Sequence, residues 1–162
     1  MATVVWDIHA VTAMLQQIGT GSATLQELKQ ASAMAGFLVE RHAKLNITRM
    51  VYSQPQRGYR RTGTLRRSIH TASPGASHDS DEAKARTSEL GGNQSPSVVR
   101  VTGDKLTTEV GTWLKYAKRV HDGTGPRMTA KPYLTDALDH NRREIEDIIA
   151  QGLVKALTRV VR

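Results

Sequence analysis

The stretch from 132 to 161 reads PYLTDALDHNRREIEDIIAQGLVKALTRVV, and its pattern decides much of the expected fold. Apolar residues recur at steps of three and four from Leu134 to Val160, which is typical of a helix with one buried face. Pro132 suits the first turn because its ring presets φ. We therefore expect one C-terminal helix over 132–162, about 28 residues and ~42 Å long, which would run past the core and contact something else.

The N-terminal part of the chain shows two further helical patterns. The segment 3–18 has an apolar stripe at steps of three and four and ends at a run of glycine and small polar residues. A second pattern begins at Ser22 or Thr24, with Glu27 at the spacing of a capping box. We expect both N-terminal helices to lie within 1–48.

Between these helices, β-branched runs predict a small antiparallel sheet. We expect about three strands, at 69–72, 97–102 and 106–110, the last two forming a hairpin. The segment 73–97 is poor in apolar residues and rich in Ser, Gly and charged residues, which predicts a long flexible loop. With helices packed on one face, these strands would give an α+β fold and a single domain over 1–162.

Around the sheet we expect three smaller features. One turn of helix should precede the first strand at 64–69, and a short helix over 113–121 should end where Gly123 can take the left-handed conformation. The segment 49–63 contains proline, glycine and arginine without an apolar period, which indicates an exposed basic loop before a sheet region at 64–131.

Positive charge is concentrated in one part of the chain. The 162 residues carry a net charge of +8, and the segment 41–78 contains eight basic residues and no acidic one. Basic and acidic residues cancel elsewhere. Such a segment favours an anionic partner, either a phosphate backbone or an acidic protein face.

The sequence contains no motif that predicts catalysis, a metal or a cofactor. No cysteine occurs, and the six histidines lack the spacing of metal ligands. Ser68 and His70 would share one face of a strand, but nothing implies an orienting carboxylate or an oxyanion donor. No stretch approaches the ~20 apolar residues of a membrane span, and the N-terminus does not resemble a signal peptide, so we expect no membrane partner.

Four short elements follow one another in a recognisable order. They are Thr62-Gly63-Thr64-Leu65-Arg66-Arg67-Ser68-Ile69, then Val110-Gly111-Thr112 with Tyr116-Ala117, then His121-Asp122-Gly123-Thr124, and then Lys131-Pro132-Tyr133-Leu134 with Ala137-Leu138. Over roughly 62–160 this order resembles the tail-completion or neck proteins of long-tailed phages, also called head–tail joining proteins or minor tail components. Two positions depart from the family pattern: His121-Asp122 replaces Val-Glu or Glu-Phe, and Tyr133 replaces the commoner Phe. The added hydroxyl needs a partner or water.

The resemblance implies a structural virion protein of the phage neck, assembled in the host cytoplasm as an oligomeric ring, for which tail symmetry suggests six copies. Its partners would be head-closure or connector proteins and a tail terminator or tail-tube protein, with transient contact to packaged DNA. We predict that the basic loop meets an acidic face of the next ring, because tight phosphate contacts would slow DNA ejection. The candidate contact residues are Arg57, Arg60, Arg61, Arg66 and Arg67. Scaffold roles fall to Gly63, Leu65, Ile69, Gly111, Tyr116, Gly123, Pro132, Tyr133 and Leu134.

Two alternatives remain open from the residues alone. A free nucleic-acid-binding module could use the basic segment 41–78, with Tyr52 and Tyr59 interleaved for base stacking. No recognition helix or binding motif accompanies that segment. A helical interaction protein of a cellular complex is the third reading.

Overall fold

The computed structural model describes most of the helical part of the chain and the main strands. The described residues are 2–7, 22–53, 63–73, 77–78, 107–112, 114, 116–124 and 129–160. Their strands are β1 (Ala2–Asp7), β2 (His70–Ala72), β3 (Ser77–His78) and β4 (Thr107–Thr112). Their helices are α2 (Ser22–Ile47), the π-helical η1 (Thr48–Tyr52), α3 (Thr64–Ser68), α5 (Ala117–Asp122), α6 (Tyr133–His140) and α7 (Arg142–Val160).

The strands form one antiparallel sheet in the order β1-β4-β2-β3. Strand β4 is central, and its Val110 pairs with Val4 of β1 on one side and with Thr71 of β2 on the other. The short β3 extends the sheet because His78 pairs with Thr71. The α+β class expected from the sequence is confirmed, with four strands in the described residues where about three were expected.

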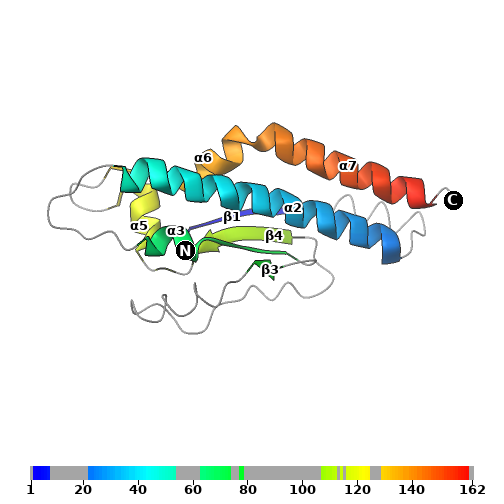
Figure 1. Ribbon diagram of the computed structural model, residues 1–162, viewed down its shortest axis with the longest axis horizontal. Helices are drawn as coiled ribbons and strands as arrows, with labels where there is room; N and C mark the ends of the chain where they lie inside the picture. Colours follow the sequence, from blue (N-terminus) through cyan, green and yellow to red (C-terminus); the bar gives the residue numbers. More distant parts are fainter. Residues whose placement is uncertain are drawn as a thin grey trace.

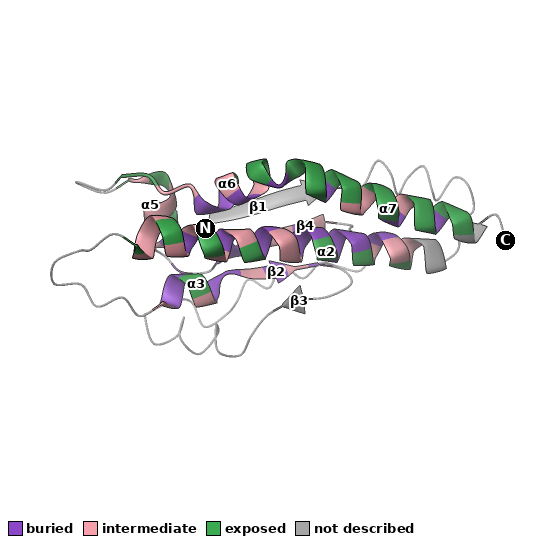
Figure 2. Ribbon diagram, turned by 45° about the horizontal axis from the view of Figure 1, so that its top comes forward, coloured by how far each residue is buried: buried purple, intermediate pink, exposed green. Residues whose placement is uncertain are grey.

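Helix α2 is the central helix of the fold. It packs against β2 and β4 with one side and against α6 and α7 with another, so that the C-terminal helices run alongside it (Figure 1). Helices α2 and α7 run in opposite directions. The main core lies where α2, α3, β4, α5 and α6 meet, and its largest fully buried side chains include Ile47, Ile69, Val110, Tyr133 and Leu134. Buried and exposed positions alternate along α2 and α7 as amphipathic helices require (Figure 2).

The expected N-terminal helix over 3–18 is wrong for its first residues, because Ala2–Asp7 is strand β1. Thr3, Val4 and Val5 are β-branched, and pairing along the whole of β4 satisfies their backbone groups. A helical period in so short a run is weak evidence against such pairing. The rest of that segment lies outside the described residues. The second helix is confirmed at Ser22–Ile47.

The expected single C-terminal helix is also wrong, because the helix is interrupted at Asn141 between α6 and α7. The Asn141 side chain is buried, and its Nδ2 donates to the Ala137 carbonyl at 2.7 Å, while its backbone N–H donates to Leu138 O. Asparagine competes with the helical backbone in this way, which turns the chain locally. Helix α7 then packs along α2 and does not continue the line of α6 (Figure 1).

The smaller elements differ in their bounds from the expected ones. The strand expected at 106–110 includes Gly111 and Thr112, and the short helix begins at Ala117, later than expected. Helix η1 occupies the start of the expected basic loop 49–63. Strand β3 and the buried Ser73 lie inside the segment 73–97 that was expected to be a flexible loop. The strand expected at 97–102 lies outside the described residues.

Candidate assembly surface

Three of the four elements of the phage-neck resemblance meet in one buried cluster, and the fourth, 121–124, lies beside it. Leu65 and Ile69 from the α3 region, Val110 of β4, and Tyr133 with Leu134 from the start of α6 belong to a single buried cluster. Gly111 lies inside β4, opposite His70 of β2, and Tyr116 packs against the cluster from its edge. Residues far apart in sequence therefore form one core, and the scaffold role expected for them is consistent with their positions.

Two of the motif glycines occupy left-handed backbone conformations. Gly63 precedes α3 with φ of 72°, and Gly123 ends α5 with φ of 69°. At Gly123 a Cβ atom would lie 2.4 Å from the backbone nitrogen of Ala130, so a side chain is excluded by space as well as by conformation. This close approach brings α5 against the segment 129–132 before α6, where the Lys131 N–H donates to the Val120 and His121 carbonyls.

Tyr133 anchors the start of α6 in the core. Its ring is fully buried, and its hydroxyl donates to the Ala117 carbonyl at 3.3 Å. Burial raises the pKa of Tyr133 well above its ordinary value. The hydroxyl that distinguishes Tyr133 from the Phe of the family pattern thus has a partner within the chain.

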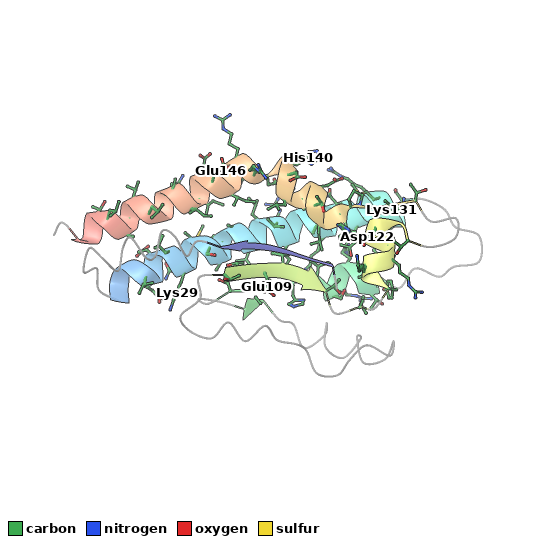
Figure 3. All side chains as sticks on the ribbon, turned by 180° about the vertical axis from the view of Figure 1, so that it is seen from behind. Lys29, Glu109, Asp122, Lys131, His140 and Glu146 are labelled. Atoms are coloured by element: carbon green, nitrogen blue, oxygen red, sulfur yellow. The ribbon has the colours of Figure 1, made fainter. Side chains whose placement is uncertain are left out.

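His121 links α5 to α6 beside this anchor. Its ring meets the Tyr133 ring edge-on at 5.1 Å, its Nδ1 lies 2.8 Å from Asp122 Oδ1, and its Nε2 lies 3.3 Å from Thr135 Oγ1. Hydrogen bonds from Lys118 and His121 hold the pKa of Asp122 below its ordinary value. The two positions that depart from the family pattern, His121-Asp122 and Tyr133, are therefore in contact, and Asp122 lies at the α5 end of the molecule (Figure 3).

The row Asp122–His121–Thr135 has the order of a carboxylate–imidazole–hydroxyl relay, but it joins two helices at the surface. Thr135 is exposed, and the second Asp122 oxygen is held by Lys118. Ser68 and His70, which the sequence placed on one face, form no such pair. The Ser68 hydroxyl donates to Leu65 O at 2.8 Å and lies 2.6 Å from Thr112 Oγ1.

A buried polar layer joins α2 to the sheet. Ser32 Oγ lies 2.5 Å from Thr108 Oγ1 of β4, and the Thr71 hydroxyl of β2 donates to Glu40 Oε2 at 2.7 Å. Glu40 is only 4% exposed, and Lys44 pairs with its other oxygen at 2.5 Å. These contacts set the position of α2 along the strands, because hydrogen bonds are directional.

The opposite face of the sheet carries Glu109, since side chains alternate along a strand. Glu109 follows the buried Thr108 in β4 and is half-buried on this face, which raises the pKa of its carboxyl (Figure 3). The two faces of β4 therefore differ: one carries α2, and the other carries a carboxylate.

The candidate contact arginines fall into two groups. Arg57, Arg60 and Arg61 lie outside the described residues. Arg66 is exposed on α3, where its N–H donates to the Tyr52 hydroxyl at 3.3 Å and its Nη1 reaches Thr48 Oγ1 at 3.5 Å. The Arg67 guanidinium folds back over Gly63, 3.6 Å from where a Cβ would stand. Arg66 therefore lies on the surface beside η1, whereas Arg67 is half-buried against its own helix start.

The outward faces of α2 and α7 carry residues that the sequence reasoning did not single out. Met34 and Leu45 of α2 are 59% and 42% exposed, and Val154 and Leu157 of α7 are 63% and 44% exposed. In the sequence these residues form a second set of apolar positions, outside the buried stripe of each helix. A search for a single apolar face overlooks such a set. Charged residues that also point outward flank both sets.

Within the part of the chain that the structure describes, no group of three or more His, Cys, Asp or Glu could hold a metal ion. None of the described helices has both the length and the apolar character needed to cross a bilayer. No protein-family model matches the chain, and neither a curated protein nor a solved structure shows significant similarity to it.

Proposed function

We propose that this chain is a structural virion protein of the phage neck, which completes or joins the tail at the head–tail interface as a subunit of an oligomeric ring. The proposed partners are head-closure or connector proteins and a tail terminator or tail-tube protein. The protein would be part of the virion after assembly in the host cytoplasm.

One observation carries the proposal: three of the four elements of the resemblance share one buried cluster, and the fourth contacts it where the His121 ring meets the Tyr133 ring. Leu65, Ile69, Val110, Tyr133 and Leu134 come from distant segments and share one buried cluster. These contacts between distant segments support reading the four elements as one structural unit.

Exposed arginines at the end of the molecule that carries α3 and η1 support a partner that binds there. Helices α3 and η1 lie side by side, joined by the hydrogen bonds from Arg66. Arg49 and Arg66 are exposed around this end, and neither has an ion-pair partner within the described residues. Exposed, unpaired arginines suit an acidic protein face, to which guanidinium groups can bind carboxylates in pairs.

Charge reversal in the basic segment tests the proposal in an infected or induced host. Substituting Arg60, Arg61, Arg66 and Arg67 with Glu should give unjoined heads and tails, counted by negative-stain electron microscopy. A matched control reverses Lys29, Arg119 and Lys155, which lie outside the basic segment, and should leave particle yield within a few-fold of wild type. Normal virions from the first variant, or virions that lack this chain altogether, would contradict the proposal.

The nucleic-acid-binding alternative uses the same end of the molecule. The described part of that surface offers little for base stacking, because Tyr52 packs against the core and its hydroxyl accepts the Arg66 N–H. A gel shift with single- and double-stranded DNA at low salt separates the two functions. A shift whose salt dependence reports several phosphate contacts favours the alternative, and its absence favours the structural role.

A further inference from the structure

Helix α2 carries an outward stripe that the other described residues do not cover. The α2 stripe consists of Met34, Leu38, Arg41 and Leu45, which follow one another at steps of four, three and four. Met34, Arg41 and Leu45 are exposed and Leu38 is half-buried at the edge of the core. Steps of four, three and four are the spacing with which one helix packs along another.

Helix α7 carries a second stripe with the same spacing. The α7 stripe consists of Arg143, Asp147, Ala150 and Val154, all of them exposed. It lies opposite the buried side of the helix, where Ile145, Gly152 and Ala156 face inward. Much of the outer side of α7 is accordingly exposed in Figure 2.

The two stripes do not meet each other inside one chain. Helices α2 and α7 contact each other through Ala31 and Gly152, and through the cluster around Leu28 and Ala156. Neither Arg41 nor Asp147 takes part in an ion pair within the described residues. The α2 stripe therefore presents apolar side chains beside one positive charge. The α7 stripe presents apolar side chains beside Asp147, which has Arg143 one turn earlier but forms no ion pair with it among the described residues.

The stripes are complementary when the helices run antiparallel. If Met34 lies against Val154, then Leu38 lies against Ala150, Arg41 against Asp147 and Leu45 against Arg143. The distance from the apolar contact to the charge is seven residues on both helices, or ~10.5 Å. The Arg143 methylenes can cover Leu45 while the charged head stays in water.

We propose that the α2 stripe of one copy packs antiparallel on the α7 stripe of the next copy, with Arg41 paired to Asp147. A second copy is the occupant because one chain supplies both complementary halves. Pairing the α2 stripe with itself would leave Arg41 without an opposite charge. Pairing the α7 stripe with itself could bring Asp147 to Arg143 only in a register that leaves Ala150 and Val154 outside the contact. Such a contact is heterologous, so repetition closes a ring or extends a filament. The inference rests on the proposed ring and names the surfaces that build it.

Charge exchange tests this contact with the full-length protein. Arg41→Glu alone places Glu against Asp147, and Asp147→Arg alone places Arg against Arg41. Each variant should therefore raise the apparent dissociation constant of the assembly at least tenfold. An equimolar mixture should assemble again, because every contact in an alternating ring then joins opposite charges. Native mass spectrometry of each variant and of the mixture reads the result, and regained assembly also shows that both variants are folded.

Disulfide trapping provides a second test, since the chain contains no cysteine of its own. The double variant Met34→Cys/Val154→Cys should give a ladder of linked oligomers under mild oxidation. The matched control Met34→Cys/Glu144→Cys places the second thiol ten residues away, ~15 Å along α7, and should give no ladder.

The outcomes separate this inference from the proposed function. The proposed contact is overturned if both charge variants assemble as the wild type does, or if both cysteine pairs give equal ladders. Either result would still allow a ring that is built on other surfaces. A wild-type chain that stays monomeric at tens of micromolar also overturns it. The proposed function is judged independently by the virions of the basic-segment variant.

Discussion

Helix α2 makes close contacts on two sides by different means. Toward the sheet it presents Ser32 and Glu40, which hydrogen-bond to Thr108 and Thr71, and Gly36, which lets the methyl groups of the same two threonines approach closely. Toward α7 it presents Leu28 and Ala31, which meet small and apolar side chains. Both contacts depend on a glycine, one on α2 itself and one on the opposing helix.

The hydrogen bonds to the sheet fix where α2 lies along the strands, whereas the contact with α7 only holds the two helices close together. Hydroxyl and carboxylate partners at 2.5–2.7 Å define where α2 stands on the strands, because sliding by one residue would leave buried polar groups unpaired. The contact with α7 at Ala31 and Gly152 depends on close packing of small side chains. The first contact should therefore tolerate substitution less well than the second.

The largest effect is expected from Gly36→Leu. A Cβ at this position would lie 2.4 Å from Thr71 Cγ2 and 2.7 Å from Thr108 Cγ2, and a leucine cannot fit without moving the helix off the sheet. We expect a loss of about 3 kcal/mol in the free energy of unfolding. Urea denaturation followed by circular dichroism measures it, with Gln30→Ala at an exposed α2 position outside the stripe as a control that should change stability by less than ~0.5 kcal/mol.

An intermediate effect is expected from Glu40→Ala. The substitution removes the acceptor of the buried Thr71 hydroxyl and the partner of Lys44, at a cost of about 2 kcal/mol. Glu40→Gln should cost about half as much, since an amide oxygen still accepts from Thr71. Equal losses for Ala and Gln in the same denaturation assay would show that the hydrogen bond does not position α2. The exposed Glu144→Ala serves as the control.

The smallest effect is expected on the α7 side, from Gly152→Ala. The added methyl would lie 2.4 Å from Ala31 Cβ, and the gain in helix propensity offsets part of the clash, leaving a loss of about 1 kcal/mol. The double variant Ala31→Gly/Gly152→Ala moves the methyl from one helix to the other and should recover part of this loss. A double-mutant cycle gives the coupling energy, and strict additivity would argue against the contact.

Local signals predicted some elements well. Helix α2 follows the expected range, because its apolar period and its small and polar start agree with its tertiary contacts. Gly123 ends α5 as expected, since its left-handed backbone conformation is a local property. The strand before Ser73 was expected from Ile69 to Ala72 and is found at His70–Ala72.

The errors arose where distant partners outweigh local pattern. Ala2–Asp7 has a spacing compatible with a helix, yet β4 offers it a full line of backbone hydrogen bonds. Asn141 belongs to an apolar period that continues through it, and only its burial against Ala137 shows why the helix turns there. The candidate surface shows the same limit, because of the five expected arginines only Arg66 is described on an exposed surface.

The sequence by itself determined the class of fold, the long helix α2, the left-handed glycine after α5, and the concentration of positive charge in 41–78. These depend on residues near one another in the chain. Only the tertiary structure decided the strand order, the hydrogen bonds that position α2 on the sheet, the contact of His121 with Tyr133, and the two outward stripes. Each of these depends on which face of an element is buried, and burial is settled by residues distant in sequence.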